Sequence, residues 1–168
     1  RGVTGLSRPL IVEAAAKLAE RHSIQGFTMR DLAAELGVGT MSIYHHLPDK
    51  RALHEALADY LWSKLSVPDR ATPWEDRMRD LTAQLWRAAR RHPALVPVLL
   101  TRRFTGPDGL PAVDALLGAA CDAGFDAAGS VRCFRVLTGF AIGLAQAEAT
   151  RTRADHERQR HGEHQHRR

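Results

Sequence analysis

The stretch that decides the fold is FTMRDLAAELGVGTMSIYHHLPDKRAL, residues 27–53. Thr28 is a favoured helix N-cap residue, and Asp31 follows three positions later, as in a capping box. The helix that starts there is expected to stop at Gly37, and a very short helix is expected over residues 40–46. Two short helices joined at a glycine are typical of a helix-turn-helix unit.

The two short helices divide their side chains between an inner and an outer face. The turn over residues 37–39 must bend sharply, which glycine permits. The apolar side chains expected to meet beneath the turn are Leu32, Leu36, Val38, Ile43 and Leu47. A recognition helix presents short polar and aromatic groups to the major groove. The outward residues here are Thr40, Met41, Ser42, Tyr44, His45 and His46.

Outside this stretch the apolar residues also recur at helical spacing, and alternating strand patterns are absent from the sequence. Further helices are expected to begin near Ser7, Asp49, Thr72, Leu110 and Asp126. The helix from Asp49 is expected to run until Pro68 closes it, with Thr72 as the cap of the next one. The last helix is expected to reach about Ala149.

The predicted fold is therefore all-α, an N-terminal three-helix helix-turn-helix domain followed by a helical bundle. The expected boundaries are 1–50 for the DNA-binding domain and 51–149 for the helical bundle. Residues 150–168 form a polar Arg/His-rich tail, which either extends the last helix into solvent or is disordered.

Charge alone does not point to nucleic acid. The formal net charge is +5, but residues 1–50 hold six Lys/Arg against five Asp/Glu, a net of +1. The tail over residues 151–168 holds six Arg against three acids, a net of +3. More than half of the excess positive charge therefore lies outside the expected DNA-binding domain.

The bulk features predict a cytoplasmic protein with no membrane partner. The sequence has no uninterrupted apolar run of membrane-spanning length, and no signal-type segment follows the first residues. Cys121 and Cys133 lack the spacing of a zinc site and are expected to be buried thiols in a reducing compartment.

The helix-turn-helix segment is specific enough to indicate a protein family. Phe27–Val38, Ser42–Leu47 and Asp49–Leu53 closely resemble the tetracycline-repressor (TetR) family. Leu116 through Phe125, followed by Leu137–Phe140, resembles the C-terminal regulatory domain of the tetracycline repressor's own branch. The resemblance implies a transcriptional regulator that binds DNA through the first domain. It also implies that the helical bundle over residues 51–149 is the regulatory domain, which binds a small molecule and dimerises.

The resemblance also assigns contacts to DNA. It places the six outward residues listed above against bases or the sugar-phosphate edge, and Thr28, Arg30 and Lys50 against phosphates. Tyr44 could instead pack inside the domain. Met41 departs from the more polar residues expected there, and would either touch a thymine methyl or pack. A metal pair at His45 and His46 is disfavoured, because adjacent residues point to different sides of a helix.

The resemblance further implies a homodimer on a palindromic operator, with half-sites ~34–36 Å apart or a multiple of that. The candidate interface residues are Gly139, Phe140, Gly143 and Leu144, since glycines four apart allow helices to approach closely. Packing within one chain is the alternative for the same residues. The resemblance also implies a further helix beyond the tail.

The effector pocket is expected between the fourth and eighth helices. Its candidate lining residues are Trp62, Trp86, His92, Phe104, Cys133, Phe134 and Leu137, for which ordinary core packing is the alternative. The metal-dependent tetracycline site is not expected, because residues 95–104 contain no His. The tail histidines likewise show no fixed metal spacing. We therefore expect no metal and no cofactor.

The expected function is that of a ligand-responsive, sequence-specific DNA-binding regulator, a repressor released from its operator by an unknown small molecule. Neither a paired acid/base constellation, a phosphate loop nor a nucleophile motif is present, so no catalytic residues and no enzyme activity are expected. The alternatives are an activator of the same fold and a helical ligand-binding protein.

Overall fold

In the computed structural model, residues 5–101 and 106–165 are described, with the backbone alone for residues 100, 101 and 152–165. This part of the chain contains helices and connecting loops and no strand, which confirms the all-α prediction. In chain order the elements are α1 (Arg8–His22), α2 (Met29–Glu35), α3 (Thr40–His46), α4 (Lys50–Ser63), α5 (Trp74–Arg91), η1 (Pro93–Leu95), α6 (Val96–Thr101), α7 (Leu110–Asp122) and α8 (Ala127–Gln165).

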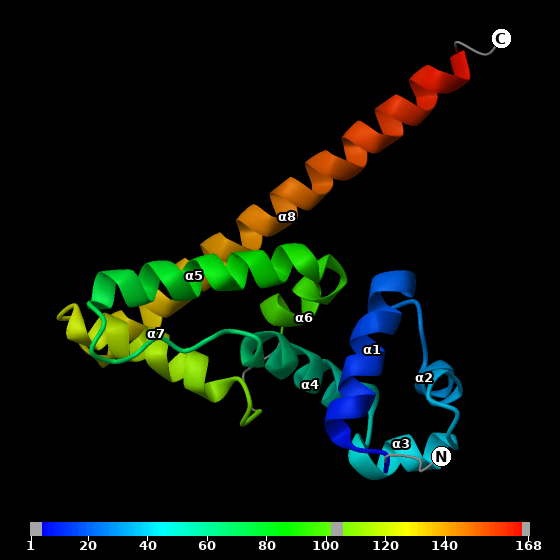
Figure 1. Cartoon of the computed structure of the whole chain (residues 1–168), viewed down its shortest axis with the longest axis horizontal. Helices are drawn as coiled ribbons and strands as arrows, with labels where there is room; N and C mark the ends of the chain where they lie inside the picture. Colours follow the sequence, from blue (N-terminus) through cyan, green and yellow to red (C-terminus); the bar gives the residue numbers. More distant parts are fainter. Residues whose placement is uncertain (1–4, 102–105, 166–168) are drawn as a thin grey trace.

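The helices form two groups, with α4 leading from one to the other (Figure 1). Helices α1, α2 and α3 form a small head at one end of the molecule, and α5, α7 and α8 pack together as the body. Helix α4 packs against α1 in the head and against α7 and α6 in the body. A single helix of 14 residues therefore contacts both groups.

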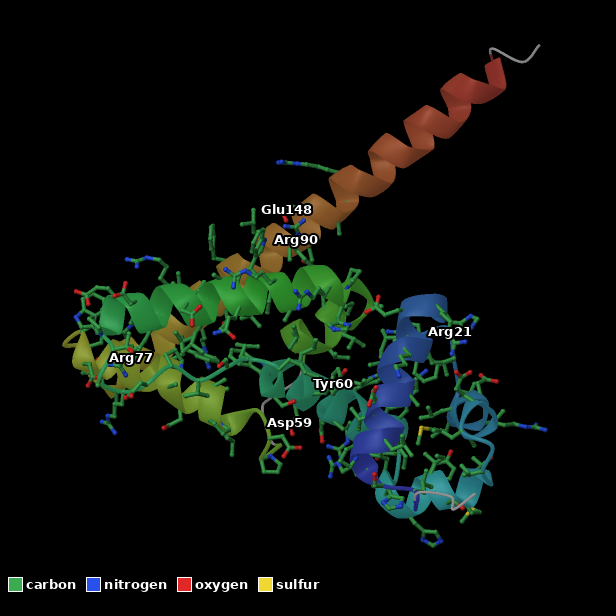
Figure 2. The ribbon with its side chains drawn as sticks, viewed as in Figure 1. Arg21, Asp59, Tyr60, Arg77, Arg90 and Glu148 are labelled. Atoms are coloured by element: carbon green, nitrogen blue, oxygen red, sulfur yellow. The ribbon has the colours of Figure 1, made fainter. Side chains whose placement is uncertain are left out.

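The body is organised around α5, which packs against both α7 and α8. Leu81, Leu85 and Ala89 recur at helical spacing on its buried face. Arg77 lies on the same helix (Figure 2). Its side chain, only 5% exposed, is paired with the carboxylate of Asp122 at the end of α7. This ion pair compensates a charge that burial would otherwise penalise strongly.

Helix α8 runs beyond the expected end near Ala149 and into the tail. It begins after Asp126, whose carboxylate accepts a hydrogen bond from the N–H of Gly129 at 2.6 Å, so the expected cap is confirmed. It continues past Ala149 to Gln165 and projects away from the body (Figure 1). Of the two alternatives left open for the tail, the structure has the extended helix over these residues.

Two helix boundaries differ from the prediction. Helix α4 ends at Ser63 and not at Pro68, because Gln84 of α5 binds both the N–H and the C=O of Ser66, at 2.7 and 3.0 Å. These bonds turn the chain toward α5. Helix α5 begins at Trp74, and Pro73 rather than Thr72 is the N-cap, since the Pro73 carbonyl accepts the first helical bonds.

The two cysteines and the apolar stretch of α8 differ from what the sequence predicts. Cys121 is exposed and not buried, while Cys133 is half-buried, and both are free thiols. Residues 127–151 of α8 are long and apolar enough to cross a membrane by length and composition alone, with a mean hydropathy of 1.2 over an 18-residue window, of which 22% is buried. The same segment carries Arg132 and Arg135.

Candidate nucleic-acid interface

The turn between α2 and α3 has the geometry that the glycine signal predicted. Gly37 has a φ of +66°, in the left-handed region that favours glycine. Its N–H donates to the carbonyl of Ala34 at 3.1 Å, and the N–H of Val38 donates to Ala33 at 3.0 Å. Gly39, the N-cap of α3, has a φ of −69°. Only the first of the two glycines is therefore required by backbone conformation.

The apolar residues expected beneath the turn do meet there. Leu32 of α2, Ile43 of α3 and Leu47 are fully buried. Leu36 and Val38 are half-buried and pack against the same core. This contact fixes the angle between α2 and α3, and with it the direction in which the opposite face of α3 points.

The outer face of α3 is open to solvent. Met41 is 69% exposed and Tyr44 is 39% exposed, so Tyr44 is not packed inside the head. His45 is also exposed, and three residues are half-buried, namely Thr40, Ser42 and His46. Within the described part of the chain no hydrogen bond occupies the side chains of these six residues. Their polar atoms are free to bind an external partner.

The start of α2 is held by a complete capping box. The N–H of Asp31 donates to Thr28 Oγ1 at 3.2 Å, and the N–H and hydroxyl of Thr28 both donate to Asp31 Oδ2 at 2.8 Å. These bonds, the backbone one first, lower the pKa of the Asp31 carboxyl. Thr28 and the neighbouring Arg30 remain exposed, so both can still reach a phosphate.

Lys50, at the start of α4, contacts the head through Phe27. Its Nζ donates to the carbonyl of Phe27 at 2.8 Å and lies 5.5 Å from the centroid of the Phe27 ring. This bond uses one of the three ammonium protons, which leaves two for a phosphate. Asp49, whose side chain accepts from the N–H of Ala52 at 2.6 Å, caps α4 as expected.

Two family profiles match the chain. Residues 11–57 match the profile described as bacterial regulatory proteins, tetR family, and residues 67–168 match tetracyclin repressor-like, C-terminal domain. The second match alone covers more than half of the chain. The chain belongs to the TetR family.

Curated relatives match over most of the chain. The HTH-type transcriptional repressor DrrR1 of Streptomyces coeruleorubidus is 27% identical over 147 residues, which are 86% of this chain and 54% of that protein. An HTH-type transcriptional regulator of Saccharopolyspora erythraea is 28% identical over 145 residues, 86% of this chain and 61% of that protein. The chain therefore spans between half and two thirds of the length of these curated relatives.

Solved TetR-family structures share the fold. Apo ActR from Streptomyces coelicolor aligns with a TM-score of 0.80 at 21% identity, covering 89% of this chain and 72% of that one. BioQ, solved with its double-stranded DNA operator, aligns with a TM-score of 0.71 at 24% identity, covering 89% of each chain. At these identities the alignments establish the arrangement of the helices only.

The effector candidates of this TetR-family chain lie in separate places. Trp62 of α4, 1% exposed, stacks on Phe134 of α8 with ring centroids 5.6 Å apart. Trp86 and Leu137 line an apolar groove of about 380 Å³ between α5 and α8. The other three candidates are His92 at the contact between α1 and α5, half-buried Cys133, and Phe104, which lies outside the described residues.

The dimer candidates share an exposed face of α8. Phe140 is 64% exposed and Leu144 is 39% exposed, and the same face carries Val136 at 68%. A Cβ added at Gly139 or Gly143 would meet no atom within 4 Å. In this chain the two glycines therefore do not serve close packing within the body, the alternative considered for them.

The structure also reveals two buried charges that sequence patterns do not single out. Arg77 occurs in a helix rich in exposed charge, so nothing in its spacing marks it as buried. Asp59 offers a weak signal, as an acid within the otherwise apolar stretch 56–62 of α4. Its carboxylate accepts hydrogen bonds from the loop before α7.

Proposed function

We propose that this chain is a ligand-responsive, sequence-specific DNA-binding repressor that acts as a homodimer and releases its operator when a small molecule binds. The observation that carries the proposal is the orientation of α3. Its inner residue Ile43 is fully buried, while Met41 and Tyr44 on the outer face are exposed and His45 lies beside them. The repressor named among the relatives supports this direction of regulation.

The outer face of α3 suits direct readout of the major groove. Hydroxyl and imidazole groups can donate to or accept from base edges, and the Met41 side chain can contact a thymine methyl. Tyr44 can reach a base or the sugar-phosphate edge, while Thr28, Arg30 and Lys50 contact phosphates and set the register. Because these phosphate contacts release counterions, operator affinity is expected to fall steeply with salt.

The decisive experiment is selection of a duplex from a random-sequence pool, followed by gel-shift titration. We expect the wild-type protein to enrich a palindromic sequence. The Tyr44→Ala variant should keep its thermal unfolding midpoint and lose at least tenfold in affinity for that duplex, about 1.4 kcal/mol. Val67→Ala, at a residue 45% exposed outside the head, is the matched control and should bind normally. Failure of the wild-type protein to enrich any sequence would contradict the proposal.

Homodimerisation is proposed through the exposed apolar face of α8. Val136, Phe140 and Leu144 expose apolar surface to water, and burying it against the same face of a second copy is favourable. Gly139 and Gly143, open to solvent in one chain, would let the two helices approach closely. A partner copy accounts for the apolar composition of α8 without a membrane, which agrees with a cytoplasmic location.

The effector is proposed to be an apolar, aromatic small molecule. The groove between α5 and α8 offers Trp86, Met78 and Leu137 as apolar contacts, with Thr82 as a polar group. Phe140 and Leu144 of the proposed dimer face also line this groove, so the effector would bind at the edge of the dimer interface. Two structural neighbours are described as complexes with actinorhodin and with minocycline. Both compounds serve as probes. We expect at least one of them to raise the thermal unfolding midpoint and to quench tryptophan fluorescence. Both effects should be smaller in Trp86→Phe. No change with either compound contradicts this groove as their binding site.

Repression and activation share the DNA-binding step and are separated by a reporter gene placed behind the selected duplex. We expect reporter output to fall when the protein is expressed and to recover when the effector is added. A rise on expression would favour an activator, and no enrichment of DNA would favour a helical ligand-binding protein. No enzyme activity is part of the proposal.

A further inference from the structure

A buried carboxylate joins α4 to the loop that precedes α7. Asp59 is 6% exposed, and its two oxygens accept hydrogen bonds from backbone N–H groups of that loop (Figure 2). The Gly109 N–H lies 2.7 Å from Oδ1, and the Asp108 N–H lies 3.3 Å from Oδ2. A buried carboxylate is costly unless such bonds compensate it, so the loop is held firmly against α4.

Two glycines allow the loop to approach α4 this closely. A Cβ added at Gly106 would lie 2.1 Å from the Asp59 carboxylate. A Cβ at Gly109 would lie 2.7 Å from the Cβ of Trp62 and 2.8 Å from Asp59 Oδ1. Gly109 has a φ of −87°, so space and not backbone conformation requires a glycine at that position.

The same contact caps α7. The N-cap residue of α7 is Gly109, which has no side chain to cap the helix. Asp59 supplies the missing acceptor from another helix, and its negative charge lies at the positive end of the α7 dipole. Asp59 thereby adds a hydrogen-bonded link between α4 and α7, two helices that also pack directly against each other.

At its other end, α4 contacts the head. Lys50 Nζ is bonded to the Phe27 carbonyl at 2.8 Å, and Leu53 and Leu57 of α4 are fully buried. A helix is stiff over the short distance from Lys50 to Asp59. A stiff α4 can therefore transmit a displacement of α7 to the head through the Asp59 bonds.

We propose that Asp59 is a positioning residue for operator binding. It couples the loop over residues 106–109 to the orientation of the head. The inference rests on the proposed DNA-binding function. Asp59 touches neither DNA nor effector, and acts through α4. By thermodynamic linkage the coupling runs both ways, so DNA bound at α3 must in turn stabilise the loop.

The test measures hydrogen–deuterium exchange of the Asp108 and Gly109 amides, with and without the duplex selected by the wild-type protein. In the wild type we expect the duplex to slow exchange about tenfold, within the range typical of allosteric coupling. In Asp59→Asn we expect the slowing to shrink below about twofold. Asp114→Asn, at an exposed acid of α7, is the matched control and should keep the wild-type response.

The measured quantity is the ratio of the amide exchange rates without and with the duplex. A variant that only lowers stability changes both rates, whereas loss of coupling changes their ratio. If Asp59→Asn does not fold, Gly106→Ala provides the second variant, since it displaces the loop and keeps the charge. Selection of a duplex with no effect on the two amides overturns the coupling alone, as does a full response in Asp59→Asn. Failure to select any duplex overturns the proposed function together with this inference.

Discussion

The carboxylate of Glu20 in α1 lies 3.4 Å from Nδ1 of His92 at the end of α5. The His92 ring also meets Tyr60 of α4 edge-on, with centroids 6.3 Å apart. This pair is a direct contact between the head and the body, separate from the connection that α4 provides. Burial raises the pKa of the Glu20 carboxyl, and the nearby His92 opposes that shift.

The first prediction concerns this raised pKa. Because folded Glu20 holds its proton to higher pH than the unfolded chain does, its contribution to stability declines as pH rises above the ordinary value of 4.5. Urea unfolding from about pH 4 to about pH 6 should show this decline. Glu20→Gln should remove it. In His92→Gln the decline should be steeper, since the group that opposes the shift is gone, and an unchanged slope in Glu20→Gln would refute the assignment.

The second prediction separates the two glycines of the turn. Gly37→Ala forces a Cβ into the left-handed region at φ +66° and should destabilise the protein by about 1–2 kcal/mol. Gly39→Ala is the matched control, because its φ is −69° and the nearest atom to a new Cβ is Ser42 Oγ at 4.0 Å. Thermal unfolding of both variants checks the difference, and equal losses would contradict it.

The third prediction concerns the cap of α2. Thr28→Ala removes the acceptor for the Asp31 N–H and should cost about 1 kcal/mol of stability. It also removes a hydroxyl that lowers the pKa of Asp31, so the Asp31 carboxyl should titrate at higher pH in the variant. In the wild type the contribution of this carboxyl is present at neutral pH and is lost as pH falls through its lowered pKa. Urea unfolding measures the loss of stability, and carboxyl-carbon NMR follows the titration of Asp31. Thr28→Ser should behave like the wild type in both measurements.

The fourth prediction tests the dimer face. Phe140→Arg places a charge at the centre of the exposed α8 face and should convert the dimer to a monomer, as measured by analytical ultracentrifugation. The monomer should keep its helical circular dichroism, because Phe140 is 64% exposed in one chain. Val131→Arg, at a residue 42% exposed nearer the start of α8, tests how far the interface extends. A wild-type protein that sediments as a monomer would rule out this interface.

The head could be predicted in detail because the sequence patterns that specify it are local. The Thr28–Asp31 box, the left-handed turn at Gly37 and the burial of Ile43 each depend on residues close together in the sequence. The contacts of these residues with DNA stay predictions, because they also depend on the shape and base sequence of the duplex. The effector candidates could not be resolved in the same way, since an aromatic residue in a helix has the same spacing in a core and in a pocket.

The boundaries that differed were decided by contacts from distant parts of the chain. Helix α4 stops early because Gln84, eighteen residues beyond Ser66, binds the backbone there. Cys121 is exposed although its helix is apolar, because only packing determines which face of a helix is covered.

What the sequence by itself determined is the all-α class and the helix-turn-helix head, because caps, glycine turns and apolar periodicity act within a few residues. Only the tertiary structure decided the buried roles of Asp59 and Arg77 and the contact between Glu20 and His92. Each of these pairs side chains or backbone groups 45 to 72 positions apart in the chain. No local pattern encodes such a pairing, since it depends on how whole helices pack.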